Sequence, residues 1–216
     1  MKEIFVVTHP EATHHVEGRV GGWFDSDLTE RGLYQAQQIA EALKGTVAPG
    51  ATLYSSELRR TAQTAGVVGA RLELEPVWLS ELREKSYGVG EGKPDAWFRE
   101  RFVPPPANGE RMDHDEGLEG AETKLQWARR VYSGMETIMR APARQKIIVT
   151  HGGSATFIIA RWIGMPIDAL DRVSFTVNSG SITRLVEDDY FHNHTVATLN
   201  DTTHLGPSHL KTGNTA

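Results

Sequence analysis

His9 directly follows a short run of strand-forming residues, Ile4 to Thr8, near the start of the 216-residue chain. Two more imidazoles, His14 and His15, come a few residues later. Imidazole can transfer protons, attack an electrophile near neutral pH or ligate a metal. The end of the first predicted strand is therefore a candidate site, and these three chemistries are the alternatives to weigh.

His151 has the same setting in the later segment IIVTHGGS. Gly152 and Gly153 follow it, and glycine lets the backbone approach a ligand closely. A predicted helix begins at these glycines, and the free N–H groups at a helix start favour an anion. We therefore expect Gly152 to contact a bound anion and His9 and His151 to face each other across one pocket.

Two further segments carry charged side chains that suit an anionic ligand. SSELRRTAQTA places Arg59 and Arg60 on the first turn of a predicted helix, where neighbouring side chains point in different directions. One of them can reach the pocket and bind an anionic oxygen through two parallel hydrogen bonds. A carboxylic acid whose charged form is disfavoured can donate a proton. SELREKSYGVGEGK offers three such groups in a glycine-rich loop, namely Glu81, Glu84 and Glu91.

The elements that must position these residues alternate between strands and helices. Strands are expected over residues 3–7, 51–56, 146–150, 181–187 and 195–200, with a further short strand within 72–84. Helices are expected over residues 28–45, 57–72, 94–102, 121–141 and 152–164. The alternation predicts a three-layer α/β/α sandwich with a mostly parallel central sheet. Ligands of such sheets bind at the carboxyl ends of the strands, where the histidines are expected.

One domain is expected over residues 1–205, followed by a tail at 206–216. Residues 88–120 hold many Gly and Pro residues, and residues 93–118 are expected to form a loop excursion over the site. Cationic side chains in this loop are candidates to recognise a second anionic group, although solvated surface charges explain them equally well. They are Arg99, Arg101, Arg111 and His114.

Composition excludes several classes of function. The net charge of −5, with 39% hydrophobic and 24% charged residues, argues against general binding of nucleic acid or anionic membranes. The absence of cysteine excludes a thiolate nucleophile, a disulfide framework and a cysteine-built metal site. No apolar run of about 18 residues occurs, and Met1 leads directly into the first strand. We therefore expect neither a membrane span nor a signal peptide, and predict a cytoplasmic protein.

These motifs resemble those of the histidine phosphatase superfamily, the phosphoglycerate mutase-like proteins, over about residues 3–205. The segment Thr8-His9-Pro10 lies at the position of the family's Arg-His-Gly, and SSELRRTAQTA matches its Ser-Ser-x-Leu-x-Arg-Ala-x-Gln-Thr-Ala. LREKSYGVGEG, GAETKLQWARRV and VTHGGS match three further family segments in the same order. The resemblance implies a phosphoglycerate mutase-like fold.

The resemblance also implies a catalytic role for four residues. His9 would attack phosphorus and become phosphohistidine. Arg60, rather than Arg59, would bind the phosphoryl oxygens together with His151, and Glu84 would be the general acid. This mechanism requires neither a metal nor another cofactor.

The first motif departs from the family at three positions. Thr8 replaces the arginine before the nucleophile, so that one hydroxyl stands for a cation with five donors. Pro10 replaces the motif glycine and removes a backbone N–H, and His15 stands at the family's Asn position. His15, Arg19 and Lys85 are candidates to occupy the space of the missing guanidinium. The residues predicted to bind substrate are therefore Thr8, His15, Arg19, Lys85 and Gly152.

A phosphatase that acts on a small phosphate monoester through a phosphohistidine is the favoured function, with a small phosphorylated molecule as partner. The alternative is a phosphate-binding or sensing protein with weak or no catalysis. Thr8 and Pro10 favour that alternative, whereas the retained Glu84 argues against it, because binding alone needs no acid. A phosphoglycerate mutase is less favoured, because nothing in the sequence shows that water is excluded.

A metal site is the third hypothesis, and it is not expected because the available imidazoles lack carboxylates at ligand spacing. Those imidazoles belong to His14, His15, His192 and His194. The oligomeric state is open, with a homodimer as one candidate.

Overall fold

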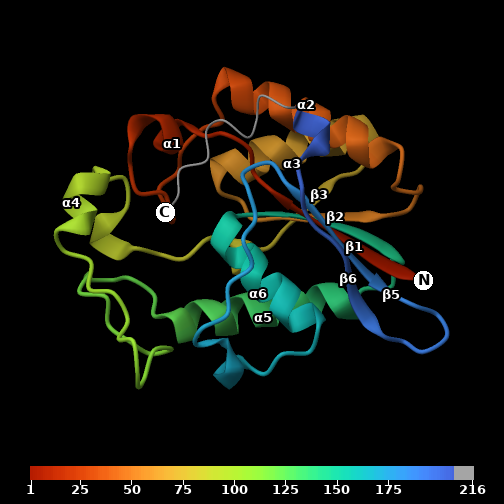
Figure 1. The fold of residues 1–216 in the computed structure, drawn as a ribbon. Coiled ribbons are helices and arrows are strands. Elements are labelled where there is room, and N and C mark those ends of the chain that lie inside the picture. Colours follow the sequence, from red (N-terminus) through yellow and green to blue (C-terminus); the bar gives the residue numbers. More distant parts are fainter. Residues whose placement is uncertain (207–216) are drawn as a thin grey trace.

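A six-stranded sheet runs through the centre of the computed structural model, which describes residues 1–206 (Figure 1). The order of strands is β3-β2-β4-β1-β5-β6. The strands from β3 to β1 pair in parallel, whereas β5 pairs antiparallel with both β1 and β6. The mostly parallel sheet is thus confirmed. Apart from Gly206, the predicted tail lies outside the described residues. The strands are β1 (Lys2–Thr8), β2 (Thr52–Ser55), β3 (Pro76–Trp78), β4 (Gln145–Thr150), β5 (Ile182–Glu187) and β6 (His194–Asp201).

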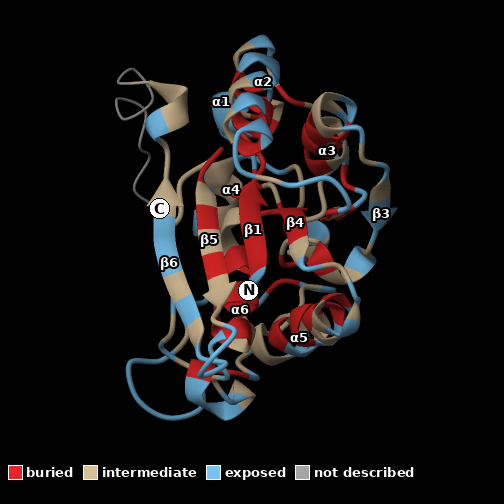
Figure 2. Ribbon diagram, turned by 90° about the vertical axis from the view of Figure 1, so that its right-hand side faces the viewer, coloured by how far each residue is buried: buried red, intermediate tan, exposed pale blue. Residues whose placement is uncertain are grey.

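Helices cover both faces of the sheet, as the three-layer prediction requires (Figure 1). Along β1, Phe5 and Val7 join the core cluster on the side of α2 and α3, while Ile4 and Val6 join the cluster on the side of α5 and α6. Successive strand residues point to opposite faces, so a strand covered on both sides is apolar throughout. Figure 2 shows the buried residues concentrated in β1 and β4, with β3 and β6 more exposed at the edges. The four helices are α2 (Glu30–Lys44), α3 (Arg59–Leu72), α5 (Lys124–Arg140) and α6 (Gly152–Trp162).

Capping residues set the starts of the long helices. Thr29 precedes α2 and its side chain accepts a hydrogen bond from the Gly32 N–H. Thr123 and Gln126 form a reciprocal capping box at the start of α5. Because a cap residue lies outside the helix that it closes, α2, α3 and α5 begin slightly later than the apolar pattern indicates.

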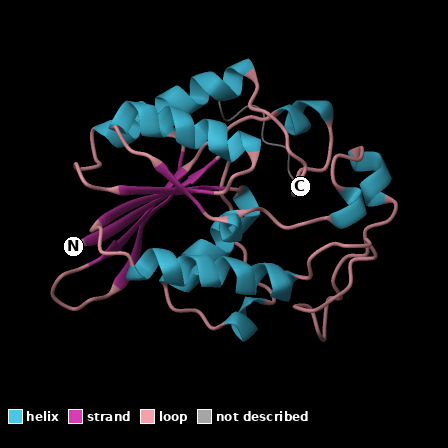
Figure 3. Cartoon of the chain, turned by 180° about the vertical axis from the view of Figure 1, so that it is seen from behind, coloured by secondary structure: helices cyan, strands magenta, loops and turns pink. Residues whose placement is uncertain are grey.

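Short elements and long loops gather beyond the carboxyl ends of β1, β2 and β4 (Figures 1 and 3). The predicted excursion carries a short helix and is anchored at its base, where the Val20 N–H donates to the Lys93 carbonyl and the Gly92 N–H donates back to Val20. This anchor joins the excursion to the loop that follows the first histidine motif. Within residues 1–206, no helix combines the length and apolar character that a membrane crossing requires. The short elements are α1 (Thr13–Glu17), α4 (Asp95–Arg99) and the 3-10 turns η1 (Ser80–Leu82), η2 (Gly88–Gly90), η3 (Ile167–Leu170) and η4 (Thr203–Leu205).

Candidate active site

Strand register brings His9 and His151 together. Thr8 and Thr150 are partners at the ends of the parallel strands β1 and β4, so the residues that follow them leave the sheet side by side. The His9 N–H donates to the Thr150 carbonyl at 2.9 Å, and the two imidazole centroids lie 5.2 Å apart, edge to face. The two histidines therefore face one space at the carboxyl edge of the sheet.

Hydrogen bonds fix the tautomer of His9. Its Nδ1 lies 2.9 Å from the carbonyl oxygen of Pro10, and a carbonyl can only accept, so Nδ1 carries the hydrogen. Nε2 then carries the lone pair, to which the Nε–H of Arg60 donates at 3.2 Å. Burial, followed by the charge of Arg60, holds the pKa of His9 well below its usual value. His9 is thus a neutral imidazole with its lone pair on Nε2, the form that a nitrogen nucleophile needs.

Arg60 is the second residue of α3 and is only 1% exposed. Its Nη1 donates to the Phe24 carbonyl at 2.8 Å and its Nη2 to the Gly22 carbonyl at 2.6 Å. Burial lowers its pKa to about 10, and the negative charge of Glu84 opposes that shift. The guanidinium therefore remains charged at neutral pH and is held in one orientation beside His9.

His151 has one ring nitrogen bound and one without a protein partner. Its Nε2 lies 2.9 Å from Oγ of Ser56, whose hydroxyl is also 2.7 Å from Oγ1 of Thr61. Its Nδ1 is buried and has no hydrogen-bond partner in the protein. Burial, followed by the charge of Arg60, also lowers the pKa of His151 well below its usual value. Buried polar atoms almost always have partners, so this nitrogen, on a ring that packs against His9, indicates a place for a bound group.

The carboxylate of Glu84 packs against the first turn of α6, the helix that begins directly after His151. The carboxylate accepts from the Gly153 N–H at 2.9 Å, from the Ser154 N–H at 3.1 Å and from the Lys85 N–H at 3.1 Å. A Cβ on Gly153 would lie 2.7 Å from this carboxylate and 2.4 Å from Trp127, so only glycine fits there. Burial raises the pKa of Glu84 despite these hydrogen bonds and the charge of Arg60. The raised pKa favours the protonated form that a general acid requires.

A second layer of side chains, which the sequence did not single out, holds Glu84 in place. Nη2 of Arg130 on α5 donates to the Glu84 carbonyl at 3.0 Å, and Nη1 donates to the Arg83 carbonyl at 3.0 Å. Nε1 of Trp23 donates to the same Glu84 carbonyl at 2.7 Å. Arg130 in turn forms a two-point ion pair with Glu122. Both members of that pair lie in the segment GAETKLQWARRV, whose resemblance to the family was the one feature of the sequence that could have pointed to them.

His14 and His15 lie beside His9 and differ in their surroundings. The His15 ring stacks on His9 with centroids 5.5 Å apart, and its Nδ1 accepts from the Ala12 N–H at 3.2 Å. Nδ1 therefore carries the lone pair of neutral His15, which leaves Nε2–H as a donor at the rim of the site. The His14 ring is buried, and its Nδ1 lies 2.7 Å from Oγ of Ser26. Burial lowers the pKa of His14 to about 2. His15 is exposed at the rim of the site, and desolvation of its ring, followed by the charge of Arg60, lowers its pKa to about 4.

Thr8 is almost fully buried and its hydroxyl is bound within the protein. Oγ1 donates to the Asn178 carbonyl at 2.6 Å and accepts from the Ser181 N–H at 3.1 Å. A hydroxyl has a single hydrogen to donate, so Thr8 has none left for a phosphoryl oxygen in this arrangement. The predicted contact between Thr8 and substrate stays a prediction, and it requires this bond to break.

The other predicted substrate-binding residues divide into two groups. Arg19 is exposed and donates to Glu17 and to the Gly92 carbonyl, and the buried Lys85 pairs with Glu116, so both cations are engaged away from His9. Gly152 lies directly after His151, and a Cβ there would meet no atom within 4 Å. Gly152 and His15 are therefore the members of the set that border open space next to His9.

His192 and His194 lie at the opposite edge of the sheet. His194 pairs with Glu187 across β5 and β6, and Glu187 pairs with Lys2 at the start of β1, whereas His9 follows the end of β1. Among residues 1–206, no three His, Asp or Glu side chains are arranged as ligands for one metal ion.

Comparison with known proteins identifies the family. The family model described as the histidine phosphatase superfamily (branch 1) matches residues 4–202. The chain is 30% identical over 181 residues to a probable phosphoglycerate mutase GpmB of Yersinia pestis (strain Pestoides F), which covers 80% of each chain. The chain therefore belongs to the histidine phosphatase superfamily.

Solved structures share the fold. The alpha-ribazole phosphatase of Shigella flexneri superposes with a TM-score of 0.75 at 24% identity, over 92% of this chain and 96% of that one. A mycobacterial glucosyl-3-phosphoglycerate phosphatase superposes with a TM-score of 0.74 at 23% identity, over 93% of this chain and 99% of that one. At these identities the likeness establishes the fold, so the activity has to be inferred from the site.

Proposed function

We propose that this protein is a metal-independent phosphatase that hydrolyses a small phosphate monoester through a phosphohistidine at His9. The observation that carries the proposal is the state of His9. Its Nδ1–H is held by the Pro10 carbonyl, and its Nε2 lone pair lies 3.2 Å from the guanidinium of Arg60. A phosphoryl group that Arg60 binds by its oxygens would present its phosphorus to that lone pair.

In the first step, Nε2 of His9 forms a bond to phosphorus while the bond from phosphorus to the ester oxygen breaks. The departing oxygen takes the proton of Glu84, whose raised pKa keeps that proton available. Arg60 and His151 bind the phosphoryl oxygens, on which charge is spread in the transition state. The products of this step are the free alcohol, phosphohistidine and the Glu84 carboxylate.

In the second step, the Glu84 carboxylate takes a proton from water, and the oxygen of that water bonds to phosphorus. The bond between phosphorus and Nε2 breaks, which releases phosphate and returns neutral His9. Glu84 thereby alternates between acid and base, as a two-step transfer requires. The cycle uses side chains only, so the proposed reaction needs no metal ion.

A phosphate-binding protein with weak turnover is the second candidate, and the bonds of Thr8 support it. The Thr8 hydroxyl is engaged by Asn178 and Ser181, and Arg19 and Lys85 are engaged with acidic residues. Within the described residues, Arg60 is then the one cation that contacts His9. Loss of one charged donor from a transition-state site slows chemistry by roughly 10²–10³-fold.

The test is to assay a panel of phosphate esters across pH 5–8 and to trap phosphohistidine by alkaline quench and mass spectrometry. The proposal predicts release of inorganic phosphate and a phosphorylated peptide that contains His9, both absent in His9→Asn. Tight phosphate binding without either signal would instead identify the binding protein. A phosphoryl group recovered mainly on a second alcohol would identify a mutase, the activity named for the Yersinia relative.

A further inference from the structure

We infer that the alcohol part of the substrate carries one aromatic ring and an anionic group, and that it occupies a pocket of about 250 Å³ beside Glu84. The pocket lies between the start of α5, the start of α6 and the excursion. Four aromatic side chains line it, and we call it the aromatic pocket: Tyr87, Phe102, Trp127 and Phe157. This inference rests on the proposed phosphatase function.

The aromatic pocket lies where the alcohol part of the substrate has to be, next to the proposed proton donor Glu84. The leaving oxygen must lie within hydrogen-bond reach of Glu84, so the alcohol must fill space next to that carboxyl group. Lys85 and Gly153 line the aromatic pocket, and their N–H groups bind the Glu84 carboxylate at 3.1 and 2.9 Å. A substrate with its phosphoryl group at His9 and its ester oxygen at Glu84 therefore extends into this pocket.

The walls of the pocket suit a flat ring. Trp127 and Phe157 meet edge to face at 4.6 Å, and Nε1 of Trp127 is fixed by Oγ of Ser154 at 2.9 Å. The ring of Phe102 stacks on that of Phe98, with centroids 5.0 Å apart. A cavity of about 150 Å³ holds a benzene molecule. The aromatic pocket therefore has room for one ring and a small substituent, and aromatic walls favour an aromatic ring.

The charge of the pocket comes from Lys124, the first residue of α5. Its Nζ donates to the Asp171 and Val173 carbonyls, each at 3.2 Å, and forms no ion pair within the described residues. An ammonium group has three hydrogens, so one remains for a ligand. Arg111 adds positive charge nearby and Asp171 opposes it, while burial lowers the pKa of Lys124. The other ammonium group, on Lys85, is already paired with Glu116. An anionic substituent is the complement of Lys124.

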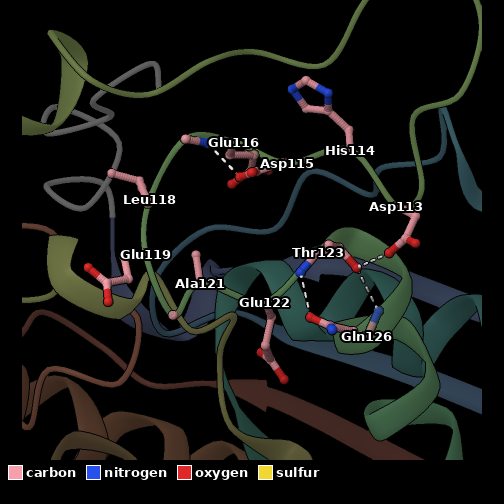
Figure 4. A pocket seen from close by; sticks show the side chains of 12 residues that line it. Asp113, His114, Asp115, Glu116, Leu118, Glu119, Ala121, Glu122, Thr123 and Gln126 are labelled. Atoms are coloured by element: carbon pink, nitrogen blue, oxygen red, sulfur yellow. Dashed lines mark hydrogen bonds between the residues drawn. The ribbon is translucent and has the colours of Figure 1, made fainter.

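The neighbouring pocket of about 540 Å³ has the opposite character (Figure 4). Its loop carries acidic side chains, among them Asp113, Asp115, Glu119 and Glu122. Carboxylates in this density repel a dianionic ester and its anionic substituent. The second anion is thus directed to Lys124, rather than to this pocket or to the predicted cations of the excursion. Of those, Arg101 is bound by Glu100, and Arg111 lines a different pocket from the aromatic one.

The test compares 4-carboxybenzyl phosphate with 4-carbamoylbenzyl phosphate, and the two 3-isomers in the same way. Each pair has the same ring and nearly the same size, and the CH₂ group insulates the ester oxygen from the substituent. The expected result is a kcat/KM at least 10-fold higher for the carboxylate in one pair. Lys124→Met should reduce that ratio to about one, whereas Lys124→Arg should retain most of it. The exposed Lys44→Met is the matched control and should leave the ratio as in wild type.

The ring is tested separately. Phe102→Ala should lower the ratio of kcat/KM for benzyl phosphate over ethyl phosphate about 5-fold or more. Equal rates for carboxylate and amide in both pairs, with phosphohistidine formed, would overturn the inference and leave the phosphatase standing. If no ester turns over, the phosphatase fails, and the dissociation constants of the matched benzylphosphonates then decide on the pocket. Equal dissociation constants for the carboxylate and the amide phosphonates would overturn the inference. Tighter binding of the carboxylate that Lys124→Met removes would support it.

Discussion

Nε of Arg60 lies 3.2 Å from Nε2 of His9, so the guanidinium donates a hydrogen bond to the lone pair that would attack phosphorus. This bond must give way when a phosphoryl group enters, because Nε2 then faces phosphorus. The two other donors of Arg60 stay on the Gly22 and Phe24 carbonyls, which keep the guanidinium next to the incoming oxygens. In the proposed reaction, Arg60 thus binds the Nε2 lone pair of His9 before the substrate enters and a phosphoryl oxygen afterwards.

Arg60→Lys should lower kcat/KM by about 10²-fold or more, because lysine lacks the planar fork that reaches two carbonyls and a phosphoryl oxygen together. Arg59→Lys is the matched control, because its neighbouring guanidinium is exposed and pairs with Asp27 at 2.6 Å. Steady-state kinetics on one ester, with circular dichroism to check folding, compare the two variants. Equal losses in both would remove the special role of Arg60.

Glu84→Gln should lower kcat/KM, which reports the first step, far more for esters of poor leaving groups than for esters of good ones, because only a poor leaving group needs the proton. We expect a loss of about 10²-fold or more for benzyl phosphate and less than about 10-fold for 4-nitrophenyl phosphate. Glu81→Gln, three residues away, is the control for a lost carboxylate in the same loop. A uniform loss of kcat/KM on both esters would show that Glu84 does not protonate the leaving group.

The pH profile gives an independent check on Glu84. Burial raises its pKa, so the protonated acid is present below that pKa and is lost as pH rises through it. The pKa of His9 is lowered, so its lone pair is already free over the assay range. The fall in kcat/KM on the alkaline side of the wild-type profile should therefore be missing in Glu84→Gln. The ester titrates too, with a second phosphate pKa of about 6, and serves as the common background in both enzymes.

The sequence was sufficient to predict the layers of the fold and the strand-end setting of the two histidines. Those properties depend on local signals. The apolar run at residues 147–149 indicates burial on both faces of the sheet, and the glycines from Gly152 on mark the end of a strand. The family of the chain was also predictable, because five motifs keep their order along the chain. The pairing of Thr8 with Thr150 places His9 beside His151. That pairing depends on the order of strands in the sheet, which the motifs indicate only through the family that they identify.

Partners across long sequence separations were not predictable from single residues. Ser56 binds His151 from the end of a different strand, and Arg130 holds Glu84 from a helix 46 residues away. Lys85 looked available for a ligand, yet Glu116 in the excursion neutralises it. Charge alone does not reveal which of several cations is already paired, so Lys124 could be recognised only from its contacts.

Thr8→Val should lower stability while it changes KM little. The substitution keeps the shape but removes the hydrogen bonds of the Thr8 hydroxyl to the Asn178 carbonyl and the Ser181 N–H, which keep their bond to each other at 3.1 Å. Loss of a hydrogen bond whose partners stay paired lowers the free energy of unfolding by about 0.5–1.5 kcal/mol. Chemical denaturation measures the loss, and Thr8→Ser, which retains the hydroxyl, should remain close to wild type. A tenfold rise in KM at unchanged stability would instead show that Thr8 binds the substrate.

His14 should make the protein sensitive to acid. Burial lowers its pKa in the folded state to about 2, against an unfolded value of about 6.5, so the unfolded chain takes up the proton first. The stability that this difference provides is fully present above pH 6.5 and is lost as pH falls toward the folded pKa. Between pH 6.5 and 4.5 one such histidine removes about 2 kcal/mol from the free energy of unfolding.

Urea denaturation at several pH values measures this slope. His14→Gln keeps a side chain that can bond to Ser26 but cannot take up a proton, so its stability should fall about 2 kcal/mol less than that of wild type over the same interval. His192→Gln removes an exposed imidazole at the far edge of the sheet and should behave as wild type does. Parallel curves for wild type and His14→Gln would mean that other groups govern the acid transition. If the free energy of unfolding falls with pH in His14→Gln as it does in wild type, but falls less steeply in His15→Gln, the effect belongs to His15, whose ring stacks on His9.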